Sequence, residues 1–234
     1  FFTYLLLKLF LTKPKFMKQA NRVRKNPIKH NVSLNEEQKH AKQLIINNQI
    51  VIITGKAGSG KSLVSALTAL EFLTTKQIDR MLVTRAAIEV GKSLGFLPGE
   101  LGDKFNPYME ALIENLHKCT DRETIKKYTD DNKIQALPVQ YIRGKTIEDI
   151  LIVEEAQNLT KHEMLAILTR LGKSGKIVIN GDNDQSDIRE QHTGLKFAIE
   201  LSKNIPEIKR IDLKENHRSD IIGKILDYEY SKKS

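Results

Sequence analysis

One stretch of the chain decides the fold, and it reads Val51-Ile52-Ile53-Thr54-Gly55-Lys56-Ala57-Gly58-Ser59-Gly60-Lys61-Ser62. Its β-branched, apolar start is typical of a buried strand, and the segment after Ser62 is compatible with a helix. Between the two, Gly55, Gly60, Lys61 and Ser62 match the phosphate-binding pattern G-x-x-x-x-G-K-[ST]. The pattern predicts a strand, a phosphate-binding loop and a helix, in that order.

The residue types of this loop suit a chain of phosphates. Its glycines allow backbone N–H groups to turn toward phosphate oxygens, and the first turn of the following helix adds N–H donors and a positive dipole. Lys61 is predicted to bind the β- and γ-phosphates of ATP, and the Ser62 hydroxyl to bind Mg²⁺. A chance glycine-rich turn is the alternative. The predicted nucleotide-binding residues of the loop are Gly55, Lys56, Ala57, Gly58, Ser59, Gly60, Lys61 and Ser62.

The composition is that of a soluble globular protein. The 234 residues, 40% of them hydrophobic and 29% charged, give room for one α/β domain with a core. The single cysteine, Cys119, excludes an internal disulfide bond and a cysteine-based zinc cluster. Because a lone cysteine suits a reducing compartment, we predict a cytoplasmic protein.

Positive charge is concentrated at the start of the chain. The net charge is +9, and residues 1–30 hold eight Lys and Arg residues and no acid. Residues 1–32 are therefore predicted to be a basic, disordered arm, which either contacts nucleic-acid phosphates or is a solvated tail. The apolar run at residues 1–12 is too short to span a bilayer, so no membrane partner is expected. We interpret residues 1–16 as an upstream read-through or a fragment artefact before Met17, and residues 33–234 as a single domain.

Short apolar strands alternate with helices along the remaining sequence. This alternation predicts an α/β fold with a mostly parallel sheet and helices on both faces, whose ligand lies at the carboxyl ends of the strands. For the first helix we expect Ser33 or Asn35 as the N-cap, with Glu36 as the capping-box partner of Ser33. The other expected strands are 80–84, 139–141, 150–153, 176–180 and 208–213, and the other expected helices are 104–118, 121–130, 160–171, 193–203 and 219–230.

Two adjacent acids follow the most apolar of these strands. Glu154 is predicted to anchor Mg²⁺, and Glu155 to accept a hydrogen bond from the water that attacks the γ-phosphate. The alternative is that both are solvated loop acids.

Polar residues after later strands are further candidates. Gln185 is predicted to sense the γ-phosphate or orient the water, and Asp182 to hold metal-bound water, unless the segment is an Asx-type turn. Arg218 is predicted to stabilise charge on the γ-phosphate, with a surface arginine as the alternative. Arg85 and Arg143 are candidates for phosphate or nucleic-acid contact.

Several motifs together carry a family resemblance. They are the loop at 55–62 and the segments 82–85, 94–99, 141–146, 154–158, 168–172 and 181–185. In this order they resemble the PhoH family of ATPases across residues 33–230, and that family is similar to the first core domain of superfamily-one helicases.

The resemblance implies a P-loop NTPase with a RecA-like sheet that hydrolyses ATP with Mg²⁺. It implies that Gln38 reads adenine and that Arg218 is the γ-phosphate arginine. It also implies coupling to single-stranded RNA or DNA, through a homo-oligomer that could be a ring in which Arg218 reaches a neighbour's nucleotide. Glu154 stands where the family usually has aspartate, which puts the rate of hydrolysis in doubt. The competing functions are a non-catalytic nucleotide switch and a small-molecule kinase.

Overall fold

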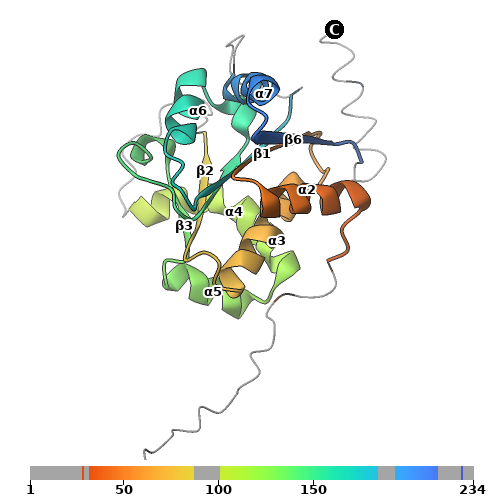
Figure 1. The fold of residues 1–234 in the computed structure, drawn as a ribbon. Coiled ribbons are helices and arrows are strands. Elements are labelled where there is room, and N and C mark those ends of the chain that lie inside the picture. Colours follow the sequence, from red (N-terminus) through yellow and green to blue (C-terminus); the bar gives the residue numbers. More distant parts are fainter. Residues whose placement is uncertain (1–27, 29–31, 87–100, 184–192, 216–227, 229–234) are drawn as a thin grey trace, which may run out of the picture.

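The computed structural model describes residues 28, 32–86, 101–183, 193–215 and 228 (Figure 1). These residues form six α-helices and six strands, and α4 and α5 follow each other directly. The helices are α2 (Glu36–Asn47), α3 (Lys61–Thr74), α4 (Leu101–Cys119), α5 (Arg122–Asp130), α6 (Lys161–Leu168) and α7 (Gly194–Asn204). The strands are β1 (Ile50–Gly55), β2 (Met81–Arg85), β3 (Ile134–Ala136), β4 (Ile150–Glu154), β5 (Lys176–Gly181) and β6 (Ile208–Leu213). Two short 3₁₀ turns, η1 (Val139–Tyr141) and η2 (Ala156–Asn158), complete the list.

The strands form one parallel sheet in the order β3-β2-β4-β5-β1-β6. This arrangement confirms the predicted α/β fold with a parallel sheet. Because all the strands run the same way, their carboxyl ends meet at one edge. The phosphate-binding loop, Glu154 and Gly181 therefore lie on the same rim.

The sheet has a hydrophobic core on each face. Along β4, Ile150 and Ile152 face one core, while Leu151 and Val153 face the other, as the period of two in a strand requires. Helices α2 to α5 cover the first face, and α6 and α7 cover the second (Figure 1). A strand buried on both faces reads as a continuous apolar run, which is why β4 was predictable.

The start of α2 confirms Asn35, one of the two predicted N-caps, but not the predicted capping box. Asn35 is the N-cap: its side chain accepts a hydrogen bond from the Gln38 N–H (2.8 Å), and the Gln38 side chain accepts one from the Asn35 N–H (3.1 Å). The capping box therefore joins Asn35 to Gln38, and the predicted pairing of Ser33 with Glu36 was wrong. The pairs Ser33–Glu36 and Asn35–Gln38 both have the three-residue separation that a capping box needs, and the helix begins at the second pair.

The strand predicted at Val139–Tyr141 was also wrong. These residues form the 3₁₀ turn η1, and the strand is β3, which ends at Ala136. The last hydrogen bond of the ladder between β2 and β3 runs from the Leu137 N–H to the Val83 carbonyl (2.7 Å). Pro138 follows and has no N–H to continue the ladder. The helix predicted at 219–230 lies outside the described residues except for Tyr228, which is helical.

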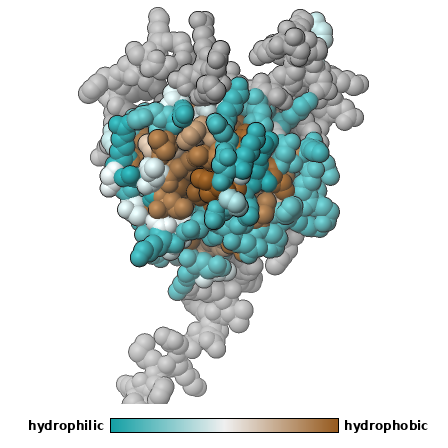
Figure 2. Space-filling model, turned by 45° about the horizontal axis from the view of Figure 1, so that its top comes forward, coloured by the Kyte–Doolittle hydropathy of each residue, from teal (hydrophilic) through white to brown (hydrophobic). Residues whose placement is uncertain are grey.

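No helix in the described part of the chain is both long and apolar enough to cross a bilayer. On the face drawn in Figure 2, hydrophobic side chains gather in the middle and hydrophilic ones surround them. Four large hydrophobic side chains among the described residues are exposed: Tyr141, Leu165, Ile205 and Tyr228.

Candidate nucleotide-binding site

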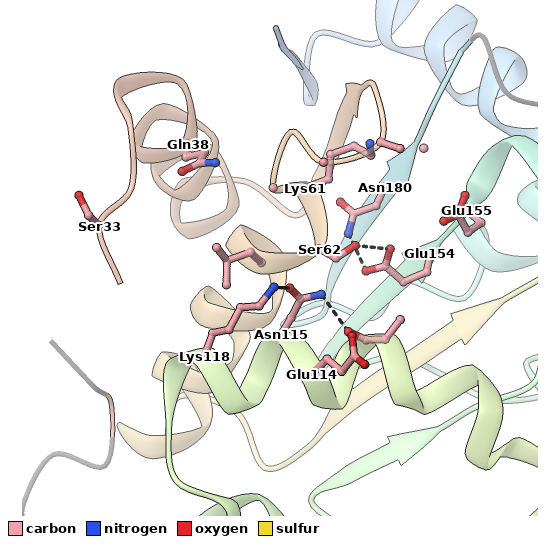
Figure 3. Close-up of a pocket in the computed structure, with 16 residues that line it drawn as sticks. Ser33, Gln38, Lys61, Ser62, Glu114, Asn115, Lys118, Glu154, Glu155 and Asn180 are labelled. Atoms are coloured by element: carbon pink, nitrogen blue, oxygen red, sulfur yellow. Dashed lines mark hydrogen bonds between the residues drawn. The ribbon is translucent and has the colours of Figure 1, made fainter. Parts of the chain in front are cut away.

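A pocket of about 490 Å³ opens at the carboxyl edge of the sheet, above the phosphate-binding loop (Figure 3). Its volume is within the range of small-ligand sites. The walls come from the start of α2, from the loop and α3, from α4, and from the ends of β4 and β5. The lining residues are Ser33, Gln38, Ala57, Gly58, Gly60, Lys61, Ser62, Leu63, Ala111, Glu114, Asn115, Lys118, Glu154, Glu155, Asn180 and Gly181.

The loop adopts the backbone shape that its glycines allow. Gly60 precedes α3 with φ +89°, a left-handed conformation that side chains other than glycine rarely adopt. A Cβ atom there would lie 2.4 Å from Gln38 Nε2, so Gly60 is also required by close packing. Lys61 begins α3, and its ammonium donates to the loop carbonyls of Gly55 (2.5 Å) and Lys56 (3.0 Å). Its charge is thereby held inside the turn, where a phosphate chain would lie.

Ser62 and Glu154 meet across the sheet edge, as the prediction of a shared metal site requires. The Ser62 hydroxyl donates to Glu154 Oε2 (2.8 Å), and Asn180 Nδ2 donates to Glu154 Oε1 (2.9 Å). Asn180 Oδ1 in turn accepts from the Ser65 hydroxyl (3.0 Å). Both carboxylate oxygens of Glu154 are thus oriented by donors from two other elements.

Burial raises the pKa of the Glu154 carboxyl above its ordinary value, and the hydrogen bonds from Ser62 and Asn180 oppose that shift. A carboxylate removed from water is stabilised by a neighbouring cation. Mg²⁺ prefers hard oxygen ligands and usually takes one or two carboxylates together with phosphate oxygens and water. One carboxylate and one hydroxyl beside a phosphate-binding loop fit this ion. The described residues contain no group of three or more His, Cys, Asp or Glu side chains that would form an all-protein metal cage.

Glu155 lines the same pocket, and its backbone is unusual. It has φ 51° and ψ 46°, the left-handed region that non-glycine residues seldom occupy. Gln157 Nε2 donates to Glu155 Oε2 (2.5 Å), and Gln157 Oε1 accepts from the backbone N–H of Asp182 (3.0 Å). Gln157 is buried and therefore ties the carboxylate of Glu155 to the end of β5.

Gln38 lies at the opposite end of the pocket from Glu155 (Figure 3). Its Nε2 donates to the Ser59 carbonyl (3.1 Å), and its Oε1 belongs to the capping box of α2. Gln38 therefore links the start of α2 to the phosphate-binding loop. Its role in reading adenine stays a prediction.

The remaining predicted residues lie either away from the pocket lining or outside the described part of the chain. Gln185 and Arg218 lie outside the described residues. Asp182 is buried at the end of β5, and Arg85 ends β2 with a buried Nε atom. Arg143 is exposed on a turn beyond β3.

Sequence reasoning missed three groups that line the pocket or lie directly behind its lining. Asn180 and Gln157 orient the two acids, and the α4 side chains, Asn115 and Lys118 among them, form one wall. A polar residue inside an apolar strand was the available signal for Asn180. The position of α4 against α3 had no comparable signal.

The fold and the pocket define a P-loop NTPase. Residues 32–229 match the family described as "PhoH-like protein", and the chain belongs to that family. It is 38% identical over 200 residues to the PhoH-like protein of Mycobacterium tuberculosis, covering 82% of this chain and 57% of that one. It is 37% identical over 172 residues to Protein PhoH of Escherichia coli, covering 71% of this chain and 48% of that one. The chain thus spans about half the length of these relatives.

Two solved helicase structures resemble the fold. Pif1 helicase from Candida albicans has 18% identity and a TM-score of 0.46, over 84% of this chain and 43% of that one. The UvsW helicase from bacteriophage T4 has 12% identity and a TM-score of 0.48, over 79% of this chain and 61% of that one.

Proposed function

We propose that the protein binds ATP with Mg²⁺, hydrolyses it with water and couples hydrolysis to single-stranded RNA or DNA. The observation that carries the proposal is that Lys61, Ser62, Glu154 and Glu155 line one pocket of nucleotide size. A phosphate-binding loop alone needs only to hold a nucleotide. Hydrolysis also requires a ligand for the metal ion and a base for the attacking water, and the adjacent carboxylates of Glu154 and Glu155 supply these two groups.

Each group in the pocket has a separate role in the proposed reaction. The backbone N–H groups of the loop and the ammonium of Lys61 bind the β- and γ-phosphates, in place of the loop carbonyls that Lys61 now contacts. Ser62 and Glu154 would hold Mg²⁺, which when bound neutralises charge on the phosphates. Glu155 accepts a hydrogen bond from the attacking water and takes its proton. Gln157 keeps the Glu155 carboxylate oriented.

Two assigned roles fall on residues outside the described part of the chain. In the proposal, Gln185 orients water at the γ-phosphate and Arg218 stabilises its charge in the transition state. Arg218 acts within a homo-oligomer, on the nucleotide of a neighbouring subunit. Mixing an Arg218→Ala variant with a Lys61→Ala variant tests this sharing. Recovery of phosphate release above the sum of the two separate variants supports it, and strict additivity refutes it.

Coupling to nucleic acid is supported by charge. Five positive charges without an acid lie in residues 17–30, after the segment interpreted as read-through, and phosphate backbones bind such segments by releasing counterions. The test is phosphate release from ATP with and without single-stranded RNA or DNA. Stimulation that depends on Lys61 supports the proposal, and equal rates with and without either strand refute the coupling.

The same assay decides between the proposal and its alternatives. A small-molecule kinase would release no phosphate until an acceptor is added. A non-catalytic switch would bind ATP tightly and release no phosphate even with nucleic acid present. The place of Glu155 in the pocket favours water activation over both.

A further inference from the structure

A turn beyond the edge strand β3 presents cationic and aromatic side chains to solvent. It spans residues 141–146, from the last residue of η1 toward β4. Tyr141 is 52% exposed, and Arg143 and Lys145 are exposed as well. The side chains of Ile142 and Ile147, which flank the tip of the turn, are fully buried in the core beneath α6. The turn is therefore anchored at two points.

The backbone of the turn is also well defined. The Ile142 N–H donates to the Val139 carbonyl (3.2 Å), and the Lys145 N–H donates to the Ile142 carbonyl (3.1 Å). Gly144 has φ +81°, and a Cβ atom there would meet nothing within 4 Å. Glycine is therefore required by conformation and not by space. These bonds hold Arg143 and Lys145 on the outer side of the turn.

Arg143 is oriented by a histidine rather than by an acid. Its guanidinium contacts His162 Nε2 at 2.5 Å. Because a guanidinium can only donate, Nε2 is the acceptor in this contact. An imidazole carries no negative charge, so it fixes the direction of Arg143 without cancelling the charge of the guanidinium. Arg80, by contrast, is paired with the carboxylate of Asp149.

The surface around this contact is positive. Lys161 and His162 are both exposed at the start of α6. Glu163 is the one acid in residues 137–147 and 159–171, and it accepts hydrogen bonds from the N–H and hydroxyl of Thr160 in the capping box of α6. The cations on the turn and on α6 are thus available to an anionic partner.

We propose that Tyr141, Arg143, Lys145, Lys161 and His162 form a binding surface for single-stranded nucleic acid. The cations contact backbone phosphates, and the exposed ring of Tyr141 stacks on an unpaired base. An acidic peptide would satisfy the charges but would leave the ring without a stacking partner. The inference rests on the proposed coupling to nucleic acid and names the surface that provides it.

The surface is connected to the nucleotide pocket along the chain. Glu155 begins a buried segment that contains η2 and Leu159 and leads directly into α6, where Lys161 and His162 lie. Gln157 in this segment contacts Glu155. A strand bound at the start of α6 therefore acts on the same rigid segment that holds the proposed catalytic carboxylate.

Fluorescence anisotropy of the full chain without nucleotide tests this surface separately from hydrolysis. The probes are 5′-labelled 20-mers of oligo(U) and oligo(dT), and an abasic 20-mer with the same phosphates. The variants are Arg143→Gln and Tyr141→Ala, and the matched control is Arg122→Gln, an exposed arginine at the start of α5. The basic arm is the same in all of them, so differences in affinity report on the turn.

Arg143→Gln is expected to weaken both labelled strands by about fivefold or more and to reduce the slope of log K against log salt by about 0.7, the value for one phosphate contact with a single strand. Tyr141→Ala is expected to weaken oligo(U) by about fivefold or more, the loss of one stacked base, and to leave binding of the abasic strand unchanged. Arg122→Gln is expected to bind like the parent. Thermal melting of each variant checks that the fold is retained.

Three results would overturn the inference. The first is that Arg143→Gln and Tyr141→Ala bind every probe as tightly as the control Arg122→Gln does. The second is that polyglutamate of equal charge displaces labelled oligo(U) as well as unlabelled oligo(U) does. The third is that the parent protein binds no strand at all. Phosphate release is measured in parallel. If binding depends on Tyr141 and Arg143 while ATP is not hydrolysed, this surface stands and the proposed hydrolysis fails.

Discussion

Replacing Asn180 with leucine tests whether the hydrogen bonds around Glu154 organise the site. The two side chains have nearly the same branched shape, so Asn180→Leu removes the bonds to Glu154 (2.9 Å) and Ser65 (3.0 Å) without opening a cavity. A bond to a charged group contributes about 1.5–3 kcal/mol, and a neutral bond about 1 kcal/mol. Ser65 keeps its second bond, to the Lys61 carbonyl (3.0 Å), and leucine gains apolar burial. We therefore expect a net loss of about 2 kcal/mol in the free energy of unfolding near pH 8.

The loss should depend on pH, and the sign follows from Glu154. Burial places its folded-state pKa above the unfolded value, so its contribution to stability is fully present below the unfolded pKa and is lost as pH rises through the folded pKa. The bond from Asn180 lowers that folded pKa, so Asn180→Leu raises it further. The two proteins should differ little near pH 4.5, and the difference should grow toward pH 8.

Differential scanning calorimetry from pH 4.5 to 8 measures this difference. For a chain of this size, about 2 kcal/mol corresponds to a fall in Tm of roughly 4–8 °C. The control is Asn183→Leu, an exposed asparagine three residues further on, where we expect a change within about 0.5 kcal/mol at every pH. A Tm difference for Asn180→Leu that stays constant across this range would refute the reasoning, because the missing bond would then not act through the Glu154 carboxylate.

Three further substitutions test the local contacts of Lys176, Gln157 and Gly60. Lys176→Met removes an ammonium that donates to the Ile45, Ile46 and Asn48 carbonyls at the end of α2, and thermal melting should show a loss of about 2 kcal/mol; no change would contradict this capping role. Gln157→Met keeps the buried volume but removes the amide's bonds to Glu155 and Asp182, so kcat should fall about tenfold or more while the Kd for ATP changes little; a change in Kd alone would count against a positioning role. Gly60→Ala places a methyl group against Gln38 and strains the backbone by about 1–2 kcal/mol, so ATP binding by titration should weaken about tenfold or more; full affinity in the variant would refute this packing.

Much of the fold was predictable because its signals are local. The run from Val51 to Ser62 contains the strand, the turn and the helix start within one short window, and the apolar run before Glu154 marks a strand buried on both faces. The carboxyl ends of such strands share one edge, so the meeting of Ser62 and Glu154 could be expected from topology alone.

The missed features depend on neighbours that are distant in sequence. Asn180 orients Glu154 only because β5 pairs with β4, and nothing near Asn180 in the chain indicates that pairing. The α4 wall of the pocket depends on helix packing in the same way. The strand expected at Val139–Tyr141 failed because Pro138 ends the β3 ladder, a local signal that outweighs the β-branched and aromatic residues after it.

The central claim is that Glu155 activates water at ATP bound by the phosphate loop. The most direct measurement compares the parent with Glu155→Gln, in phosphate release and in ATP affinity on the same preparations. We expect the variant to bind ATP with an affinity within about threefold of the parent's. Its rate of phosphate release should be at least about 100-fold lower, which is the contribution of a general base. Phosphate release by Glu155→Gln at the parent's rate would contradict the account.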